Sequence, residues 1–266
     1  MKKVLQNFFS FFLLLNLLLN TSYGHFIVLK PNKDIVENPS DKRLKIICKF
    51  THPMQGYPNM DFEIEKFGVY VNGKEEKLNF KTRWIRAFPK SDKYVRMYLA
   101  NYKIKKPGVY QFFVIPKPYW EAEEGKFIKQ ITKVYLQAFG LEEGWDKPIG
   151  LKAEIVPLTR PFGLWEGNTF KGRAFINGKP AKNVKVEIEY LNPNFKSIKL
   201  PASVFITQVV KTDENGYFEY TIPWAGWWGF SVIGKDGNIT YKGHSGPVEL
   251  DAVLWIRAYK KPKGVK

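Results

Sequence analysis

The stretch Val184-Lys185-Val186-Glu187-Ile188-Glu189-Tyr190 decides the fold class, because apolar and charged side chains alternate along it. Successive side chains of a strand point to opposite faces, so a period of two is typical of a half-buried antiparallel strand. The dipeptides Asn177-Gly178, Asn215-Gly216 and Asp236-Gly237 interrupt the neighbouring stretches and are typical of hairpin turns. Several short strands separated by such turns predict a β-sandwich.

Outward from this stretch, the rest of the chain also favours strands over helices. Residues 140–150, which include Trp145, Asp146 and Pro148, break the periodicity and predict a connection between domains. The expected fold is therefore all-β, with two consecutive β-sandwich domains at residues 25–145 and 146–266. The strands expected besides 184–190 are residues 25–30, 43–50, 65–71, 94–104, 109–115, 126–139 and 250–259.

The second domain carries a further pattern. Residues 212–218, Thr-Asp-Glu-Asn-Gly-Tyr-Phe, are followed by Pro223 and then by Gly226-Trp227-Trp228. This arrangement resembles the transthyretin-like or carboxypeptidase-regulatory-like modules, which are immunoglobulin-like sandwiches common in exported proteins. In such modules the turn glycine takes positive φ and the aromatic side chains fill the core. We expect core packing for Trp224, Trp227 and Trp228 rather than stacking on a sugar ring.

The N-terminus predicts export. Met1-Lys2-Lys3 is a short positive segment, and an apolar stretch from Phe8 to Leu19 follows it. Small residues at Ser22 and Gly24 fit a cleavage site, so residues 1–24 are predicted to be a signal peptide. No later segment approaches the roughly 20 apolar residues of a spanning helix. We expect a periplasmic or otherwise extracytoplasmic protein that is not itself transmembrane after cleavage; the alternatives are an uncleaved anchor and cleavage one or two residues away.

Charge and cysteine content narrow the function classes. The formal net charge is +17, and it falls to +15 once Lys2 and Lys3 are removed with the leader. Export and the scatter of the lysines argue against a nucleic-acid partner, so a solvated lysine-rich surface is expected. Cys48 is the single cysteine, which rules out an intramolecular disulfide, and its place in an alternating strand predicts a core thiol without chemistry.

Cleavage after Gly24 would create a metal chelate at His25. A free α-amine and the Nδ1 of the same histidine can bind one metal together, whereas an internal histidine has only a non-basic amide nitrogen. His52, directly after the predicted strand 43–50, continues the parity of its inward side chains and could project from the strand end. A lone histidine is often structural, but two in one domain favour a metal site.

The loop that follows His52 supplies further candidate ligands. Met54 and Met60 carry thioethers, which favour soft metals, and Asp61 carries a carboxylate, which suits divalent ions. The alternatives are that both methionines fill the core and that Asp61 is solvated. His244 is expected in a surface loop and would join the site only if the two domains pack suitably.

No catalytic set emerges from the sequence. It contains no nucleophile elbow, phosphate-binding glycine loop or HExxH zinc motif. Glu121, Glu123 and Glu124 cluster near Trp120, but a solvated turn accounts for them. The chain is not expected to be an enzyme.

Six blocks of the chain form a further pattern, and they are Phe50–Pro53, Lys129–Val134, Ala153–Leu158, Pro161–Trp165, Ala225–Phe230 and Ala252–Ile256. These blocks resemble the exported domain of unknown function 4198 family, whose members are described as nickel uptake transporter family proteins or as the NikK-like periplasmic component of cobalt and nickel transport. The resemblance implies a protein that binds Ni²⁺, or alternatively Co²⁺ or Cu²⁺, and passes it to membrane transporter components. It covers His25 and His52. The loop 55–60 lacks the further histidine of many members, which leaves the ligand count open.

Two other hypotheses remain open. An N-terminal histidine with a second histidine on a β-sandwich also resembles the copper histidine brace of lytic polysaccharide monooxygenases, which are oxidative enzymes. Alternatively, the two sandwiches form a metal-free extracytoplasmic interaction module, and His25 has no metal-binding role.

Overall fold

The computed structural model describes residues 24–193 and 198–264, and the predicted signal peptide, apart from Gly24, lies outside them. Strands dominate, and they form three sheets. The two helices of the described chain are single 3-10 turns, Pro39–Asp41 and Ser203–Phe205, and neither has the length or apolar character that crossing a bilayer requires. The all-β prediction is confirmed.

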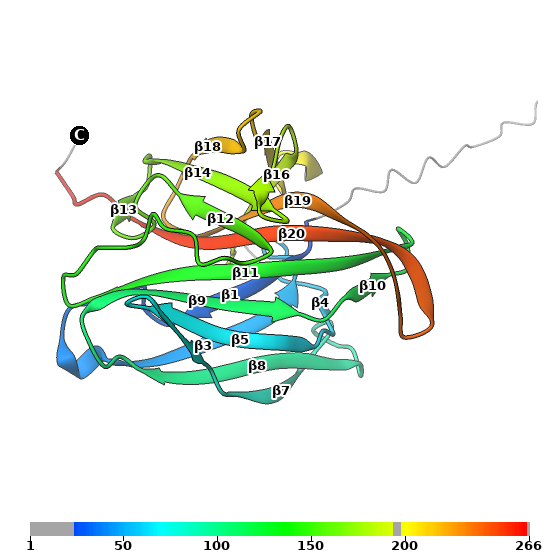
Figure 1. Ribbon diagram of the computed structural model, residues 1–266, viewed down its shortest axis with the longest axis horizontal. Coiled ribbons are helices and arrows are strands. Elements are labelled where there is room, and N and C mark those ends of the chain that lie inside the picture. The colour runs from blue at the N-terminus through cyan, green and yellow to red at the C-terminus, as the bar shows by residue number, and fades with distance from the viewer. Residues whose placement is uncertain (1–23, 194–197, 265–266) are drawn as a thin grey trace, which may run out of the picture.

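The largest sheet contains eleven strands and runs through the middle of the molecule (Figure 1). Along its main path the order is β17 (Gln208–Lys211), β16 (Lys185–Tyr190), β19 (Gly226–Tyr241), β20 (His244–Tyr259), β11 (Lys126–Ala138), β9 (Gly108–Pro116), β5 (Ile64–Val71) and β6 (Lys74–Lys77). Three short strands pair at its margins: β2 (Ile35–Val36), β10 (Tyr119–Glu121) and β13 (Leu164–Trp165).

A smaller sheet covers each side of this central sheet. The first consists of β1 (Phe26–Pro31), β3 (Arg43–Thr51), β8 (Tyr94–Lys103) and β7 (Phe80–Arg86), with β4 (Asn59–Met60) paired to β3. The other consists of β12 (Ala153–Pro157), β14 (Thr169–Ile176) and β15 (Lys179–Pro180), with β18 (Tyr217–Thr221) paired to β14. In Figure 1 these two sheets lie below and above the long strands β11 and β20.

Two hydrophobic cores fill the spaces between the three layers. Alternation along β20 supplies both: Val253 and Trp255 enter the first core, whereas Leu254 and Ile256 enter the second. The predicted two sandwiches are therefore present, and they share the central sheet. The parallel pairing of β11 with β20 connects the two sandwiches, and it places Phe127 opposite Val248.

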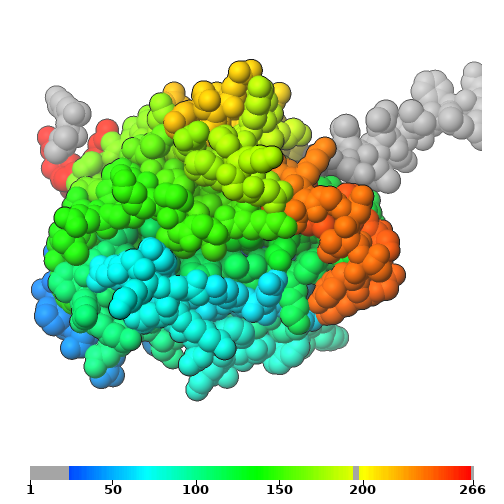
Figure 2. All heavy atoms as spheres, in the orientation of Figure 1, coloured from blue at the N-terminus to red at the C-terminus, as the bar shows by residue number. Residues whose placement is uncertain are grey.

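The turn predictions are confirmed in part. Asn177-Gly178 connects the paired strands β14 and β15, and both residues have positive φ, which asparagine and glycine tolerate. Asp236-Gly237 is not a hairpin turn, because β19 continues through it with a register shift between Lys235 and Asn238. The chain reverses later, at Lys242-Gly243, and the extended β19–β20 hairpin forms the orange lobe in Figure 2.

Cys48 lies on β3 and is fully buried in the first core, as predicted. Burial raises the pKa of its thiol, because an apolar environment disfavours the thiolate. The side chain therefore packs as a small apolar group. Trp227 and Trp228 are likewise buried, whereas Trp224 remains 40% exposed.

Candidate metal site

The antiparallel ladder between β1 and β3 brings His25 and His52 together. Phe26 is paired with Thr51, so one further step of the same register places His25 opposite His52. The centroids of the two imidazole rings lie 4.6 Å apart, and the ring planes meet at 74°. Opposite residues of a ladder share a face, which explains how two histidines distant in sequence become neighbours.

The loop after β3 fixes the orientation of His52. The Thr51 hydroxyl donates to the carbonyl of Pro58 at 3.1 Å, and the Gly56 N–H donates to the carbonyl of His52 at 2.7 Å. Nδ1 of His52 lies 3.1 Å from Oε1 of Gln55. An amide oxygen accepts hydrogen bonds, so this contact is a hydrogen bond in the tautomer whose proton is on Nδ1, and in that tautomer Nε2 carries the lone pair.

Both imidazoles are held in the neutral form. Burial, followed by the proximity of His25, lowers the pKa of His52 to about 4. Burial also lowers the pKa of His25; Glu124 opposes this and Lys126 adds to it. Metal ions bind neutral imidazole, so the environment prepares both rings as ligands at neutral pH.

His25 is also fixed through its backbone and remains open to solvent. The Gln130 side-chain amide donates to the carbonyl of His25, and its oxygen accepts from the N–H of Ile27 at 2.8 Å. Nε2 of His25 lies 3.4 Å from Oε2 of Glu121, and the histidine side chain is 19% exposed. A solute can therefore approach His25, whereas His52 is only 7% exposed.

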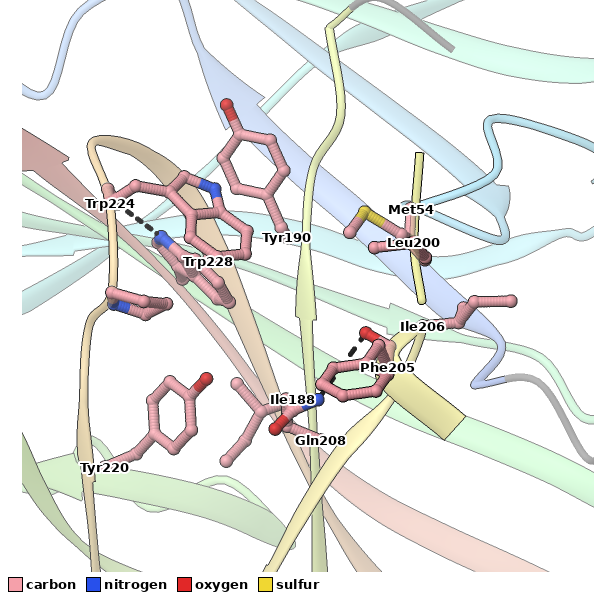
Figure 3. Close-up of a pocket in the computed structure, with 11 residues that line it drawn as sticks. Met54, Ile188, Tyr190, Leu200, Phe205, Ile206, Gln208, Tyr220, Trp224 and Trp228 are labelled. Carbon is pink, nitrogen blue, oxygen red and sulfur yellow. Dashed lines mark hydrogen bonds between the residues drawn. The ribbon is translucent and has the colours of Figure 1, made fainter. Parts of the chain in front are cut away.

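The two methionines among the predicted ligands lie in apolar surroundings. Met60, on β4, is 8% exposed and packs in the first core, where its strand partner is Phe50. Met54 lines an apolar pocket with Tyr190 and Trp228 (Figure 3). The alternative that both methionines fill apolar space therefore accounts for their positions.

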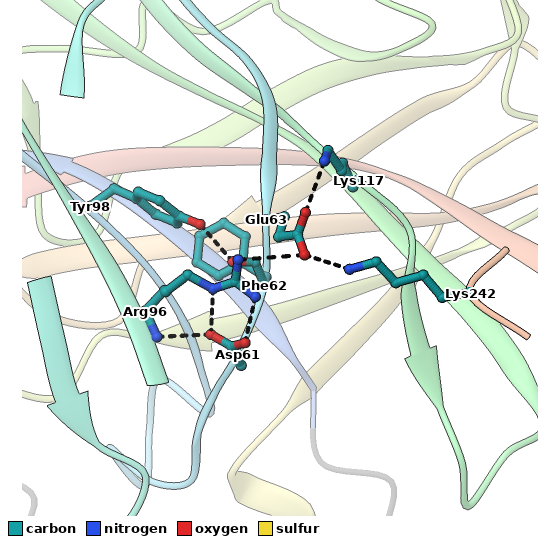
Figure 4. Close-up of polar contacts among 7 residues, drawn as sticks. All are labelled: Asp61, Phe62, Glu63, Arg96, Tyr98, Lys117 and Lys242. Atoms are coloured by element: carbon teal, nitrogen blue, oxygen red, sulfur yellow. Dashed lines mark hydrogen bonds and ion pairs between the residues drawn. The ribbon is translucent and has the colours of Figure 1, made fainter. Parts of the chain in front are cut away.

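Asp61 is engaged by Arg96 (Figure 4). Nε and an Nη of Arg96 donate to the two carboxylate oxygens at 2.8 and 2.6 Å, and the Arg96 N–H donates to Oδ1 at 2.9 Å. Partial burial alone would raise the pKa of Asp61, but these hydrogen bonds lower it. The neighbouring Glu63 contacts Lys117 and Lys242. Asp61 therefore belongs to an ion-pair network in which side chains of the protein itself carry the positive charges.

His244 lies away from the histidine pair. It begins β20, is exposed, and stacks on Trp120 with ring centroids 4.7 Å apart. The packing of the two halves thus gives it an aromatic partner. Within residues 24–193 and 198–264, no three His, Cys, Asp or Glu side chains are close enough together to hold a metal ion.

Two acidic residues that the sequence reading placed on the polar face of β16 lie beside the candidate site. Glu189 is fully buried, and Glu187 is half-buried. A Cβ placed on Gly24 would lie 2.8 Å from Oε1 of Glu189 and 3.2 Å from Oε2 of Glu187, so the chain just before His25 covers these carboxylates. Burial raises the pKa of Glu189 to about 8 and that of Glu187 to about 6.

The alternation in residues 184–190 could not reveal this burial. It showed which side chains share a face, but that face is covered by Gly24, just before β1 and more than 150 residues earlier in the chain. The only sequence signal was that two glutamates share the polar face with a single lysine, Lys185.

Comparison with known families identifies the chain. The model of the domain of unknown function DUF4198 matches residues 22–236. The chain belongs to the DUF4198 family. No curated protein matches this DUF4198 chain.

Several solved structures are weakly similar to this DUF4198 protein. The D0–D1 domain of intimin is 14% identical, with a TM-score of 0.23 and coverage of 89% of this chain and 100% of that one. Dimeric latent PorU from Porphyromonas gingivalis is 11% identical, with a TM-score of 0.24 and coverage of 88% and 20%. The major pilin subunit BcpA of Bacillus cereus is 12% identical, with a TM-score of 0.19 and coverage of 89% and 71%.

Proposed function

We propose that this DUF4198 protein is an exported binding protein for a divalent metal, Ni²⁺ first and Co²⁺ second, that delivers the metal to a membrane transporter. The observation that carries the proposal is the contact between the rings of His25 and His52, 4.6 Å apart, at the end of the predicted mature chain. Two neutral imidazoles suit borderline divalent ions such as Ni²⁺. The resemblance to nickel uptake proteins supplies the transporter partner.

Signal cleavage would complete the donor set. In the described chain Gly24 precedes His25, so the His25 nitrogen is an amide. Cleavage at this bond would turn it into an α-amine, which can bind a metal together with Nδ1 of the same residue, and His52 would add a third nitrogen. Loss of Gly24 would also uncover Glu187 and Glu189, which it contacts, and so place negative charge beside the bound cation.

Native mass spectrometry of the secreted protein tests the proposal. After chelator treatment, protein that begins at His25 should retain one Ni²⁺. H52A, and a variant with one alanine inserted between Gly24 and His25, should each lose at least about tenfold in affinity, because each removes a nitrogen ligand. H244A is the matched control, because His244 is exposed and stacks on Trp120, and it should bind normally. Equal retention by H52A and wild type would contradict the proposal.

The nitrogen-only donor set also fits the copper histidine brace, and Cu²⁺ binds most nitrogen sites more tightly than Ni²⁺. Affinity therefore does not separate the two functions. Hydrogen peroxide production by the copper-loaded protein, absent from copper-loaded H52A, would favour an oxidase. A protein that stays bare with both metals would instead be an interaction module.

A further inference from the structure

A cavity of about 260 Å³ lies beside His25, on the polar side of the central sheet. Strand register explains its lining. Asp251 of β20 is paired with Ile233 of β19 on one side and with Gln130 of β11 on the other, so these residues share a face. Glu187 of β16 reaches the same face through its pairing with Ser231. Three of these strands, β16, β20 and β11, thus direct polar side chains into one space, and β19 contributes Ile233.

Acidic groups outnumber basic ones in this cavity. Its lining includes Glu124, Glu187, Glu249 and Asp251, against Lys126 and Lys185. Lys126 forms ion pairs with both Glu124 and Glu249. In the described part of the chain, no lysine or arginine nitrogen lies within ion-pair distance of Glu187 or Asp251. These two carboxylates therefore form no direct ion pair within the described residues, although the charges of Lys185 and Lys126 act on Glu187 from a greater distance.

Asp251 gives an independent indication of a ligand. It is fully buried, and Oδ2 accepts from the Gln130 side chain at 3.2 Å. Oδ1 is also buried but has no hydrogen-bond partner among the described residues, and the same holds for Oγ of Ser231 on this face. Buried polar atoms are nearly always satisfied, so two unsatisfied oxygens on one face indicate a ligand that the protein does not itself provide.

We propose that this cavity binds a hydrated divalent cation beside His25, through the carboxylates of Glu187, Glu249 and Asp251. The cation is proposed to keep its water shell, since the described residues offer no three acidic, histidine or cysteine side chains close enough to coordinate it directly. The volume admits several waters, each of which occupies about 30 Å³ in the liquid. The bridging waters would hydrogen-bond to the carboxylates and to Oδ1 of Asp251.

The cavity would help the protein capture a cation despite its own charge. A net charge of +17 repels cations at long range, although salt screens this repulsion over about 8 Å. A local acidic cavity reverses the sign of the field where the cation must arrive. The idea that a cation binds first in the cavity and then moves to the histidine pair rests on the proposed function. Cation binding in the cavity does not rest on it.

Hexaamminecobalt(III) is a suitable probe, because its inert ammine shell imitates a hydrated cation and prevents coordination by histidine. Calorimetric titration should show one site in the wild-type protein. E187Q should weaken binding about tenfold because it removes a close charge, and D251N should do the same because it removes a carboxyl that would ionise beside the cation; burial and the nearby Glu249 raise the pKa of Asp251. E214Q removes an exposed acid paired only with Lys182 and is the charge-matched control. H52A should bind the probe normally, which separates this cavity from the histidine pair.

Two outcomes distinguish this proposal from the proposed function. If D251N, E187Q and E214Q bind the probe equally, or the wild type does not bind it, the cavity proposal is wrong even where Ni²⁺ is retained. If the probe binds but the wild type retains no Ni²⁺, the proposed function fails alone. Because D251N could disturb folding, E187Q, at a half-buried position, must show the effect in a protein with an unchanged circular dichroism spectrum.

Discussion

Two buried glutamates in this molecule have opposite surroundings. Glu154 on β12 is 3% exposed, and its Oε1 lies 2.6 Å from Nζ of Lys133. Glu189 on β16 is 0% exposed and accepts hydrogen bonds from the Thr207 hydroxyl and the Met54 N–H, but no cation contacts it in the described chain. Burial of an acid therefore does not by itself indicate function; the absence of an internal cation is the more informative observation.

The exposed network around Asp61 strengthens this comparison. Asp61 was a predicted ligand, yet Arg96 engages both of its oxygens. Glu187 and Glu189 were not predicted ligands, yet they lie next to Gly24 and His25 without a lysine or arginine partner in the described residues. Some of these carboxylates are paired with a lysine or arginine of the protein, and others are not. Each of the following experiments tests whether this pairing decides how a carboxylate affects stability or metal binding.

The largest effect is expected for K133M. Removing the lysine leaves Glu154 buried without its cation, and breaking one side of a buried pair costs about 3–5 kcal/mol of unfolding free energy. Urea denaturation at pH 7 would measure the loss. The double variant K133M/E154Q should recover part of it, because the uncompensated charge is then gone. A loss below about 1 kcal/mol in K133M would show that the pair is not the stabilising feature of this region.

In protein that retains Gly24, E189Q should have the next largest effect, and it should depend on pH. Below about pH 4.5 Glu189 is protonated in both the folded and unfolded states. Between that pH and about 8 the unfolded carboxylate ionises while burial keeps the folded one protonated, so the wild-type unfolding free energy falls as pH rises. The slope is about 1.4 kcal/mol per pH unit for one proton.

E189Q should flatten this decline, since glutamine is neutral at every pH. Urea denaturation at pH 5, 6, 7 and 8 would reveal the difference, with the exposed-site variant E214Q as the control. Parallel pH profiles for E189Q and wild type would show that Glu189 does not carry the expected penalty.

An external cation should stabilise the His25 region as Lys133 stabilises Glu154. Ni²⁺ at about 100 times its dissociation constant should add about 2.7 kcal/mol to the unfolding free energy of protein that begins at His25. The melting temperature with and without Ni²⁺ would measure this. H244A should show the full increase and H52A little of it; an equal increase in both would place the metal elsewhere.

The smallest effect is expected for D61N. The side chains of Asp61 and Arg96 are 39% and 26% exposed, so solvent weakens their attraction, and a loss of about 1 kcal/mol is expected. Ni²⁺ retention should be unchanged in D61N, because Arg96 already holds this carboxylate. Reduced Ni²⁺ retention with unchanged stability would indicate that Asp61 is a metal ligand after all.

Local pattern placed eight of the twenty strands of the described residues, and strands such as β14 and β19 were not given a range. β3, predicted at residues 43–50 and observed at Arg43–Thr51, alternates clearly because only one of its faces is buried. β7 was missed, since its side chains are mostly exposed and carry little apolar periodicity. The hairpin at Lys242-Gly243 was misplaced to Asp236-Gly237, because a bulge and a turn favour similar residues.

The sequence by itself determined the fold class, the two sandwiches and the inert burial of Cys48, because these depend on alternation and turn residues. It also named His25 and His52 as candidate ligands from their chemistry, and their role as ligands stays a prediction. Only the tertiary structure decided which face of each strand is covered and by what. The parallel pairing of β11 with β20 joined the sandwiches, and Gly24, just before β1, covered Glu187 and Glu189. Such contacts join segments more than 100 residues apart, and local periodicity carries no information about the partner that a face will meet.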